Sequence, residues 1–215
     1  MFNVILNEFF WFIQNSPSYY HTIALTEDGK AYVAGRNNEG ELGIGQTTSS
    51  TITTWTIMKS TNGTSEMTGI KQVATGYMHT VVLTDNGYMY ATGNNGYYQL
   101  SDGSSTQRKN LVYMKDSSNN TMKDVKEIYA AGNTSVAITN SNGIYVVGEN
   151  SYAQLLQGNT STVTRFTKVK NSENIDKIVM TTTTGSQTTA YVDNIGRIFT
   201  IGYAGLGQLG DGSLT

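Results

Sequence analysis

The sequence contains no cysteine, a single proline and two histidines among its 215 residues. The absence of cysteine excludes disulfide bonds, thiolate nucleophiles and cysteine-ligated zinc sites. Charged residues are also scarce, because Asp, Glu, Lys and Arg together make up 14% of the chain and the formal net charge is −2. No cluster of Lys and Arg is dense enough to displace the counterions of a phosphate backbone, so the composition predicts no binding to nucleic acid.

Helical periodicity and membrane-spanning runs are missing as well. No stretch keeps apolar residues at positions i, i+3, i+4 and i+7, which indicates that helices are rare. The apolar N-terminal segment, residues 1–15, lacks the basic start of a secretory signal peptide and carries Glu8. Because this segment is also too short to span a bilayer, we expect a buried strand or a short docking segment, and no membrane insertion.

Glycine, asparagine, threonine and tyrosine take the place of the missing residue types, with 23 Gly and 14 Tyr. Threonine and tyrosine favour strands, because β-branched and aromatic side chains fit a pleated, half-buried surface. Short clusters of Gly and Asn favour tight turns. The composition therefore predicts an all-β chain with short strands and frequent turns.

A glycine–leucine–glycine pattern recurs along the chain at constant internal spacing. It starts at Gly35, Leu42 and Gly45 and reappears after intervals of 58, 55 and 54 residues. Other positions follow the same intervals: a Glu or Gln precedes each leucine, and a Thr or Ser opens an apolar stretch upstream. The recurring residues are Gly35, Gly93, Gly148 and Gly202; Leu42, Leu100, Leu155 and Leu209; Gly45, Gly103, Gly158 and Gly212; Glu41, Gln99, Gln154 and Gln208; and Thr22, Thr80, Ser135 and Thr189.

Each unit of about 55 residues can be interpreted as one small antiparallel sheet. In the first unit, a strand at residues 21–26 leads through an Asp-Gly turn to a second strand at 31–34, which ends at Gly35. We expect third strands near 53–58, 111–114 and 166–169, and fourth strands near 70–74, 125–130 and 175–180. The prediction is a single partial β-propeller domain over residues 1–215, an incomplete ring of about 3.5–4 four-stranded blades, with repeats at 16–74, 75–130, 131–184 and 185–215.

The repeat resembles that of the regulator-of-chromosome-condensation family. The matching runs are His21-Thr22-Ile23-Ala24-Leu25-Thr26-Glu27-Asp28-Gly29, Gly76-Tyr77-Met78-His79-Thr80, Gly93-Asn94-Asn95-Gly96-Tyr97-Tyr98-Gln99-Leu100 and Gly205-Leu206-Gly207-Gln208-Leu209-Gly210-Asp211-Gly212. The resemblance implies a β-propeller, usually of seven blades, whose loops on one face grip a partner protein. The family includes exchange factors for a small GTPase as well as other binding proteins, so the fold does not fix the function.

The sequence departs from the family pattern in several places. Ser18 stands where the second unit has Gly76, and Thr134 and Thr188 stand where the first two units have histidine. Fewer than four complete blades are too few for the family's usual ring. We therefore expect a fragment of a longer protein, or a chain whose ring is completed by self-association with a second copy.

No combination of residues in the sequence supports catalysis, a cofactor or a metal. His21 and His79 occupy one repeat position, which favours buried hydrogen bonds to backbone over a catalytic role. The Gly-x-Gly-x-x-Gly run at 205–210 contains the repeat leucine and is not followed by a helix, so we expect no dinucleotide there. Acidic turn residues lack the alternating spacing of a calcium loop. We predict that the protein is not an enzyme and has no catalytic, cofactor-binding or metal-binding residues.

The candidate partner-binding residues lie just before the opening of each repeat. Tyrosine is a common interface anchor, because it offers a large contact area and loses little conformational entropy. The alternative is that half or more of these side chains simply pack between blades. The candidates are Tyr19, Tyr20, Tyr77, Met78, Asn133 and Gln187, with Tyr97, Tyr98 and Tyr152 as a second set.

The function that follows is a non-catalytic scaffold for protein–protein interaction, in a bacterial repeat protein that is secreted or at the cell surface. The alternative is a guanine-nucleotide exchange factor for a small GTPase, which the family resemblance implies and which would need an intact ring. A propeller-fold enzyme would need carboxylates or histidines that converge on the channel, and the repeat comparison offers none. The identity of the protein partner is not contained in the sequence.

Overall fold

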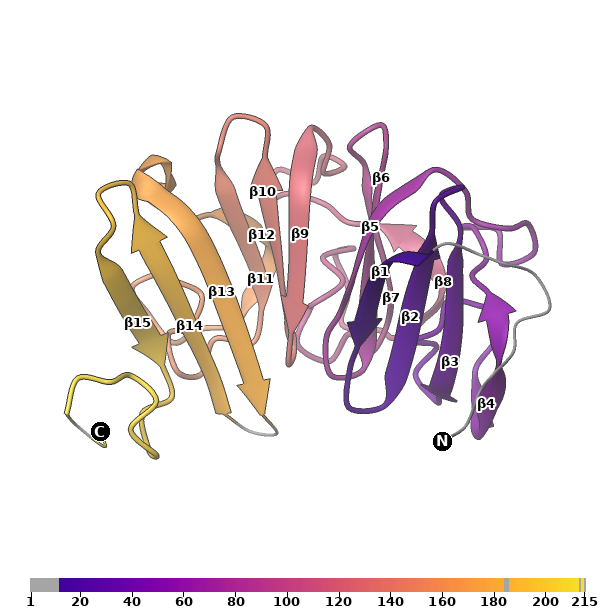
Figure 1. Ribbon diagram of the computed structural model, residues 1–215, viewed down its shortest axis with the longest axis horizontal. Helices are drawn as coiled ribbons and strands as arrows, with labels where there is room; N and C mark the ends of the chain where they lie inside the picture. The colour runs from indigo at the N-terminus through magenta and orange to yellow at the C-terminus, as the bar shows by residue number, and fades with distance from the viewer. Residues whose placement is uncertain (1–11, 184–185, 213, 215) are drawn as a thin grey trace.

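The computed structural model describes residues 12–183, 186–212 and 214, in which the strands form four antiparallel sheets that stand side by side in an arc (Figure 1). The sheets follow chain order, and the only helix in the described residues is one turn of 3-10 helix, η1 (Ser172–Asn174). The first sheet contains β1 (Phe12–Pro17), β2 (His21–Thr26), β3 (Ala31–Asn37) and β4 (Thr48–Ile57); the second contains β5 (Ile70–Thr75), β6 (His79–Thr84), β7 (Met89–Gly93) and β8 (Arg108–Tyr113); the third contains β9 (Val125–Ala131), β10 (Thr134–Thr139), β11 (Ile144–Gly148) and β12 (Val163–Lys168); and the fourth contains β13 (Ile175–Thr183), β14 (Ser186–Asp193) and β15 (Ile198–Gly202).

The sheets are offset from the sequence repeats. Strands form where they were expected, but β5 pairs with β6 and β9 pairs with β10. The grouping of residues 70–74, 125–130 and 175–180 as the fourth strands of the preceding units is therefore wrong, because each of these segments is the first strand of the next sheet, and β13 likewise pairs with β14. The first sheet obtains its corresponding strand, β1, from the apolar N-terminal segment, of which residues 1–11 lie outside the described residues.

The first glycine of each repeat sits where two strands come too close for a side chain. Gly93 has a φ of 106°, and a Cβ added to it would lie 2.5 Å from the carbonyl oxygen of Met78, just before β6, and 2.8 Å from the Cα of His79 on β6. Gly35, Gly148 and Gly202 have the same left-handed φ and the same close approach. The positions predicted from spacing alone to require a turn or a close approach are therefore confirmed.

The apolar core lies between successive sheets rather than within one sheet. One face of each sheet, which we call its forward face, packs on the following sheet. Between the second and third sheets, for example, Leu83, Met89 and Leu100 on the forward face pack with Ile128 and Phe166 of the next sheet. The repeat leucines Leu42, Leu100 and Leu155 are buried in these interfaces, and Leu209 in the last sheet is half-buried. Each sheet is thus stabilised mainly by its neighbours, as in other repeat architectures.

The first strands of neighbouring sheets are joined by amide side chains. The side chain of Gln14 donates to the carbonyl of Val73 (2.7 Å) and accepts from its N–H (2.9 Å). One repeat further on, Gln72 makes the same pair of hydrogen bonds with Ile128 (2.8 and 2.9 Å). These bonds join β1 to β5 and β5 to β9.

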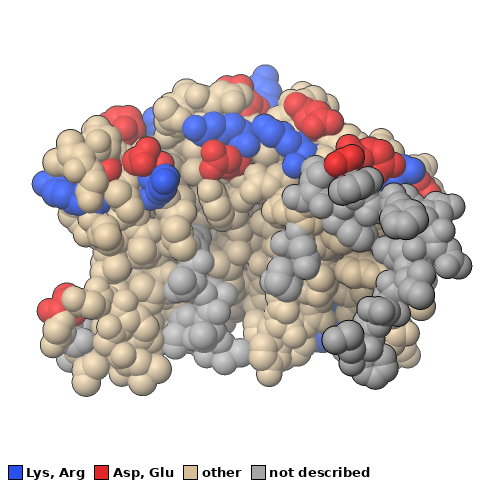
Figure 2. All heavy atoms as spheres, viewed as in Figure 1, with Lys and Arg blue, Asp and Glu red and all other residues tan. Residues whose placement is uncertain are grey.

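The two long edges of the arc differ in charge. In Figure 2, Lys, Arg, Asp and Glu side chains gather along the upper edge, and the lower edge is almost free of them. The loop from β1 to β2 and the chain after β15 lie along the lower edge, and the turns from β6 to β7 and from β10 to β11 lie along the upper one (Figure 1). On the face shown in Figure 2, the described residues of the lower edge therefore carry few charged side chains; we call this edge the charge-poor edge, and the repeat openings lie on it.

Candidate protein-binding face

Short turns present the repeat openings at the lower edge. In the first sheet the N–H of Ser18 donates to the carbonyl of His21 (2.9 Å), and in the second the N–H of Gly76 donates to the carbonyl of His79 (2.9 Å). The second turn is also tied to the third sheet, because the N–H of Tyr77 donates to the carbonyl of Gly132 (2.8 Å). The side chains between these anchors are consequently held at the surface by a fixed backbone.

Three of the predicted residues form one aromatic cluster. The ring of Tyr20 lies edge-on to the rings of Tyr19 and Tyr77, with centroids 4.8 and 5.0 Å apart. The hydroxyl groups of Tyr20 and Tyr77 share a hydrogen bond of 3.2 Å, and this bond is the main reason that the pKa of Tyr77 is raised. The guanidinium of Arg36 lies 5.0 Å from the Tyr20 ring centroid, a cation–π distance. Tyr19 remains 74% exposed at the outside of the cluster.

The loops that follow the second strand of each sheet lie beside these turns. The N–H of Arg36 donates to the carbonyl of Tyr20 (2.9 Å), and that of Asn94 donates to the carbonyl of Met78 (2.8 Å). Tyr97 and Tyr152 occupy equivalent positions in two of these loops, and both are exposed. The ring of Tyr152 also contacts Tyr203, 5.1 Å away in the next loop. We call the surface formed by Tyr19, Tyr20, Tyr77, Tyr97 and Tyr152 the tyrosine face.

The remaining predicted residues divide between surface and interior. Met78 and Asn133 are half-buried, and the Asn133 amide donates to Glu149 (2.9 Å). Gln187 is buried, and its amide donates to Glu149 (2.6 Å) and accepts from Gln154 (3.1 Å). The structure thus brings Tyr19, Tyr20 and Tyr77 together, and it uses Gln187 to join the third and fourth sheets.

Beneath the tyrosine face, the residue before each repeat leucine holds its loop in shape. The side-chain oxygens of Gln99 and Gln154 accept the N–H of Tyr97 and Tyr152, respectively (both 2.9 Å). These glutamines are buried, as is Glu41 at the same repeat position. The position of the exposed tyrosines is therefore determined by buried polar groups two residues away.

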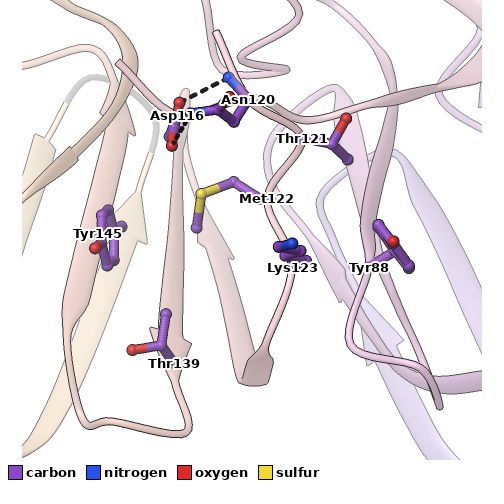
Figure 3. Close-up of a pocket in the computed structure, with 8 residues that line it drawn as sticks. All are labelled: Tyr88, Asp116, Asn120, Thr121, Met122, Lys123, Thr139 and Tyr145. Atoms are coloured by element: carbon purple, nitrogen blue, oxygen red, sulfur yellow. Dashed lines mark hydrogen bonds between the residues drawn. The ribbon is translucent and has the colours of Figure 1, made fainter. Parts of the chain in front are cut away.

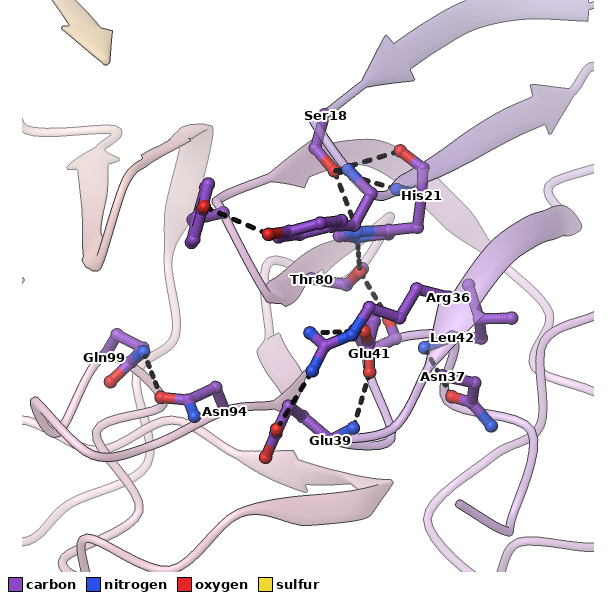
Figure 4. A network of polar contacts seen from close by, with 12 residues as sticks. Ser18, His21, Arg36, Asn37, Glu39, Glu41, Leu42, Thr80, Asn94 and Gln99 are labelled. Atoms are coloured by element: carbon purple, nitrogen blue, oxygen red, sulfur yellow. Dashed lines mark hydrogen bonds and ion pairs between the residues drawn. The ribbon is translucent and has the colours of Figure 1, made fainter. Parts of the chain in front are cut away.

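Glu41 keeps this role with an altered partner (Figure 4). Its carboxylate accepts the N–H of Glu39 (2.8 Å) and the guanidinium of Arg36 (3.4 Å), whereas Gln99 donates its amide to Asn94 (3.0 Å). Arg36 and Asn94 are equivalent, each five residues before the Glu or Gln. Burial is the main cause that raises the pKa of Glu41, and the nearby Arg36 opposes it. The carboxylate of Glu41 in the first sheet is thus paired with the guanidinium of Arg36. The other sheets have no basic residue at the position of Arg36.

The two histidines join neighbouring sheets. Nε2 of His21 lies 2.9 Å from the Thr80 hydroxyl, which itself donates to the carbonyl of Glu41 (2.7 Å) (Figure 4). Because the Thr80 hydroxyl donates its proton to the carbonyl of Glu41, Nε2 of His21 must donate in the bond to the Thr80 oxygen. His79 makes the same contact with Ser135 (3.0 Å). The predicted burial is confirmed, but the partner at Nε2 is a side-chain hydroxyl rather than backbone.

Burial controls the protonation of both histidines. It is the main cause that lowers the pKa of His21 to about 4 and that of His79 to about 3, and the guanidinium of Arg36 adds to the effect at His21. Ser18 lies 2.8 Å from Nδ1 of His21. In the second sheet Gly76 replaces this serine, and Nδ1 of His79 has no hydrogen-bond partner among the described residues. Both rings are therefore neutral at neutral pH.

A pocket of about 560 Å³ lies elsewhere, between the second and third sheets (Figure 3). The carboxylate of Asp116, its acidic lining residue, accepts the N–H of Ser118 (2.9 Å) and of Asn120 (2.8 Å). Both N–H groups donate to the same carboxylate oxygen, Oδ1, so Asp116 holds a turn in place. Across the described residues no group of three or more His, Asp or Glu side chains is arranged to hold a metal ion.

Sequence reasoning missed a second column of buried polar residues. Asn37, Asn95 and Asn150 recur at the same intervals as the leucines, and each accepts the N–H of the leucine five residues later, at 2.9–3.1 Å. Each also donates its amide to the far side of the loop. The constant spacing would have revealed this column, but the partnership of Arg36 with Glu41 needed the folded loop.

The comparisons with known proteins agree with this architecture. The model of the regulator of chromosome condensation (RCC1) repeat matches residues 18–41 and 70–99. The probable E3 ubiquitin-protein ligase HERC4 of Homo sapiens is 32% identical over 204 residues, which cover 94% of this chain and 18% of HERC4. The crystal structure of human WBSCR16 superimposes with a TM-score of 0.77 at 21% identity, over 97% of this chain and 52% of that one. Yeast RCC1 (Prp20) bound to Kap60 gives a TM-score of 0.75 at 15% identity, over 95% and 46%.

The fold and the repeats together define an all-β repeat domain of the propeller type. The chain is an RCC1 repeat domain, homologous to part of HERC4, and its four sheets correspond to about half of an RCC1 propeller. It spans about half the length of these solved structures and about a fifth of HERC4. Within the part of the chain that the structure describes, no helix has the length and hydrophobicity to cross a membrane.

Proposed function

We propose that this RCC1 repeat domain is a non-catalytic protein-binding scaffold and that it engages its partner through the tyrosine face. The observation that carries the proposal is the convergence of five tyrosines, from three consecutive repeats, on the charge-poor edge. Exposed apolar or aromatic patches on a soluble domain commonly mark interaction sites. Tyrosine also supplies both contact area and a hydroxyl for hydrogen bonds across the interface.

The fixed arrangement of the tyrosines on the tyrosine face supports the proposed binding role. Tyr20 is packed between Arg36 and two other tyrosines, so its conformation is fixed before a partner arrives. The backbone of Tyr97 is held by the side chain of Gln99, which accepts its N–H. A preorganised surface loses less side-chain entropy on association, which improves affinity for a given contact area.

The titratable side chains that could take part in catalysis make structural contacts instead. His21 and His79 are buried, neutral and hydrogen-bonded between sheets, and Asp116 closes a turn. Glu41 is buried against Arg36. These roles support a scaffold rather than an enzyme, because a catalytic group needs access to substrate and a pKa near the working pH.

Quantitative affinity purification from cells that express the protein tests the proposal. The double variant Tyr19→Ser, Tyr77→Ser removes the centre of the face, and Tyr113→Ser makes the same change on the exposed outer strand β8. We expect partner proteins that co-purify with the wild type and with Tyr113→Ser but not with the double variant. Equal recovery with all three proteins would contradict the proposal.

The alternative, nucleotide exchange on a small GTPase, is tested in parallel. The chain is mixed with small GTPases loaded with a fluorescent guanine nucleotide, and nucleotide release is followed. Our proposal predicts release at the intrinsic rate. Accelerated release would support the exchange-factor function instead.

A further inference from the structure

The pocket between the second and third sheets has an aromatic side chain on each of two walls (Figure 3). Tyr145 on β11 and Tyr88, just before β7, stand on opposite sides of it, and the buried Met122 also lines it. Both tyrosines are half-buried. The volume of about 560 Å³ falls in the range of about 300–1,000 Å³ that is typical of small-molecule sites. The pocket therefore has the size and part of the lining of a ligand site.

Several polar groups of the lining have no hydrogen-bond or ion-pair partner among the described residues. They are the hydroxyls of Tyr88, Tyr145 and Thr121 and the ammonium of Lys123. The second carboxylate oxygen of Asp116, Oδ2, accepts the side-chain amide of Asn120 at 3.3 Å. Asp116 and Lys123 are the charged residues of the lining, and their formal charges cancel. The pocket thus offers donors and acceptors but no net charge.

The loop that joins β8 to β9 forms one wall of the pocket, and its backbone is fixed. The N–H of Asp116 donates to the carbonyl of Asn120 (2.8 Å), and the N–H of Ser117 donates to the carbonyl of Phe166 on β12 (3.1 Å). The N–H of Phe166 donates in turn to the carbonyl of Lys115 (3.3 Å). Because the loop is held by both sheets, little conformational entropy remains to be lost when a ligand binds.

The equivalent place at the interface of the first and second sheets is built differently. Lys30 and Glu66 are the repeat equivalents of Tyr88 and Thr121, and they form an ion pair of 3.7 Å. Tyr90, which matches the third-sheet tyrosine of the pocket, is buried. The uncharged aromatic lining at the second interface is therefore a property of its own residues and is not imposed by the repeat.

We propose that this pocket binds a neutral, hydroxyl-rich ligand, namely a mono- or disaccharide. The C–H faces of a sugar ring can pack on aromatic rings such as those of Tyr88 and Tyr145. Sugar hydroxyls both donate and accept, which matches a lining that combines a carboxylate, an ammonium and hydroxyls. A purely apolar ligand would leave these polar groups buried without partners, and an anion would be repelled by Asp116. The inference does not depend on the tyrosine face, which lies at the other edge of the arc (Figure 1).

Saturation-transfer difference NMR on the complete 215-residue chain tests the proposal. The probes are glucose, galactose, mannose, N-acetylglucosamine and their disaccharides, and inorganic phosphate is followed separately by phosphorus NMR. We expect saturation transfer to at least one sugar, with a Kd in the millimolar range or below. No transfer to any sugar at about 10 mM, or binding of phosphate in preference to every sugar, would overturn the proposal.

Variants of the lining show whether the sugar occupies this pocket. Tyr88→Lys, Thr121→Glu recreates the residues of the first interface, so its circular dichroism should stay that of the wild type while sugar affinity falls at least about tenfold. Lys123→Ala changes an exposed side chain and should weaken binding by about tenfold. Lys170→Ala is the matched control, because it removes an exposed lysine outside the pocket. Wild-type affinity in both pocket variants, or an equal loss with Lys170→Ala, would overturn the assignment.

Discussion

At the scale of single residues, conformational requirements and buried polar contacts explain most of the repeat pattern. Gly35, within β3, and the glycines that end β7, β11 and β15 combine positive φ with a backbone carbonyl where a side chain would begin. The Thr or Ser at the repeat opening is a donor to the preceding sheet. Both columns were visible in the sequence, because a constant physical requirement leaves the same residue at a constant spacing.

Replacement of Gly93 by alanine tests the steric reason for this column. Gly93→Ala should lower the free energy of unfolding by at least about 2 kcal/mol, because a strained backbone and a clash with the Met78 carbonyl act together. Gly158→Ala is the control: its φ is +71°, but a Cβ there meets nothing within 4 Å. We expect a loss of about 1 kcal/mol for the control. Equal losses in urea denaturation would show that close approach is not the reason.

The buried histidines predict an acid-sensitive stability. Their folded pKa values, about 4 for His21 and about 3 for His79, lie below the unfolded value of 6.5. The unfolded chain therefore binds protons first, so stability is full above pH 6.5 and falls as the pH drops toward the folded pKa values. The loss should reach about 2 kcal/mol per histidine near pH 5.

Urea denaturation across this pH range measures the effect, with the double variant His21→Gln, His79→Gln as control. The variant should be less stable at neutral pH and should lose little further stability between pH 6.5 and 4. The carboxyl groups of Asp102 and Asp193, whose pKa values are lowered from 3.8, affect stability only at lower pH. An identical pH dependence in wild type and variant would contradict the assignment.

At the scale of strands and loops, the sequence predicted where strands occur better than which strands pair. The intervals between strands are local properties, set by turn residues such as Asp28-Gly29. Which segment completes a sheet is decided by packing, and a periodic sequence has no marked starting point. For this reason residues 70–74 were grouped with the wrong sheet, although the strand itself was predicted correctly.

The sequence also did not reveal hydrogen-bonded pairs of loop residues where both partners differ between one repeat and the next. Gln99 with Asn94 in the second sheet becomes Glu41 with Arg36 in the first. Neither Glu41 nor Arg36 is unusual by itself, and the compensation becomes visible only when the loop brings the two side chains together. The tyrosine cluster is similar, because Tyr19 and Tyr77 are far apart in sequence and meet only after the sheets stack.

A double-mutant cycle tests the Arg36–Glu41 partnership. Arg36→Asn alone should lower the free energy of unfolding by about 1–3 kcal/mol, because it leaves a buried carboxylate without its cation. The double variant Arg36→Asn, Glu41→Gln recreates the pair found in the second sheet and should recover most of the loss. Additive effects of the two substitutions in thermal or urea unfolding would contradict a coupled pair.

At the scale of the whole molecule, the arc separates two kinds of surface. The hairpin turns carry the charged residues on the upper edge, and the repeat openings carry the tyrosines on the lower edge (Figures 1 and 2). The propeller fold could be predicted from the repeat, and so could Tyr19, Tyr20 and Tyr77 as candidates. The separation of charge and the burial of Gln187 could not, because they depend on how consecutive sheets are oriented.

Site-specific photocrosslinking tests the central claim, that the tyrosine face is the protein-binding surface, most directly. A photoreactive phenylalanine analogue replaces Tyr97 or Tyr152 on this face, or Tyr113 on the outer strand β8, and the three side chains have similar exposed fractions of 41%, 39% and 45%. After irradiation in cells that express the protein, we predict crosslinks to the same partner protein from positions 97 and 152 and none to it from position 113. Crosslinks from position 113 alone, or from all three positions equally, would contradict the account.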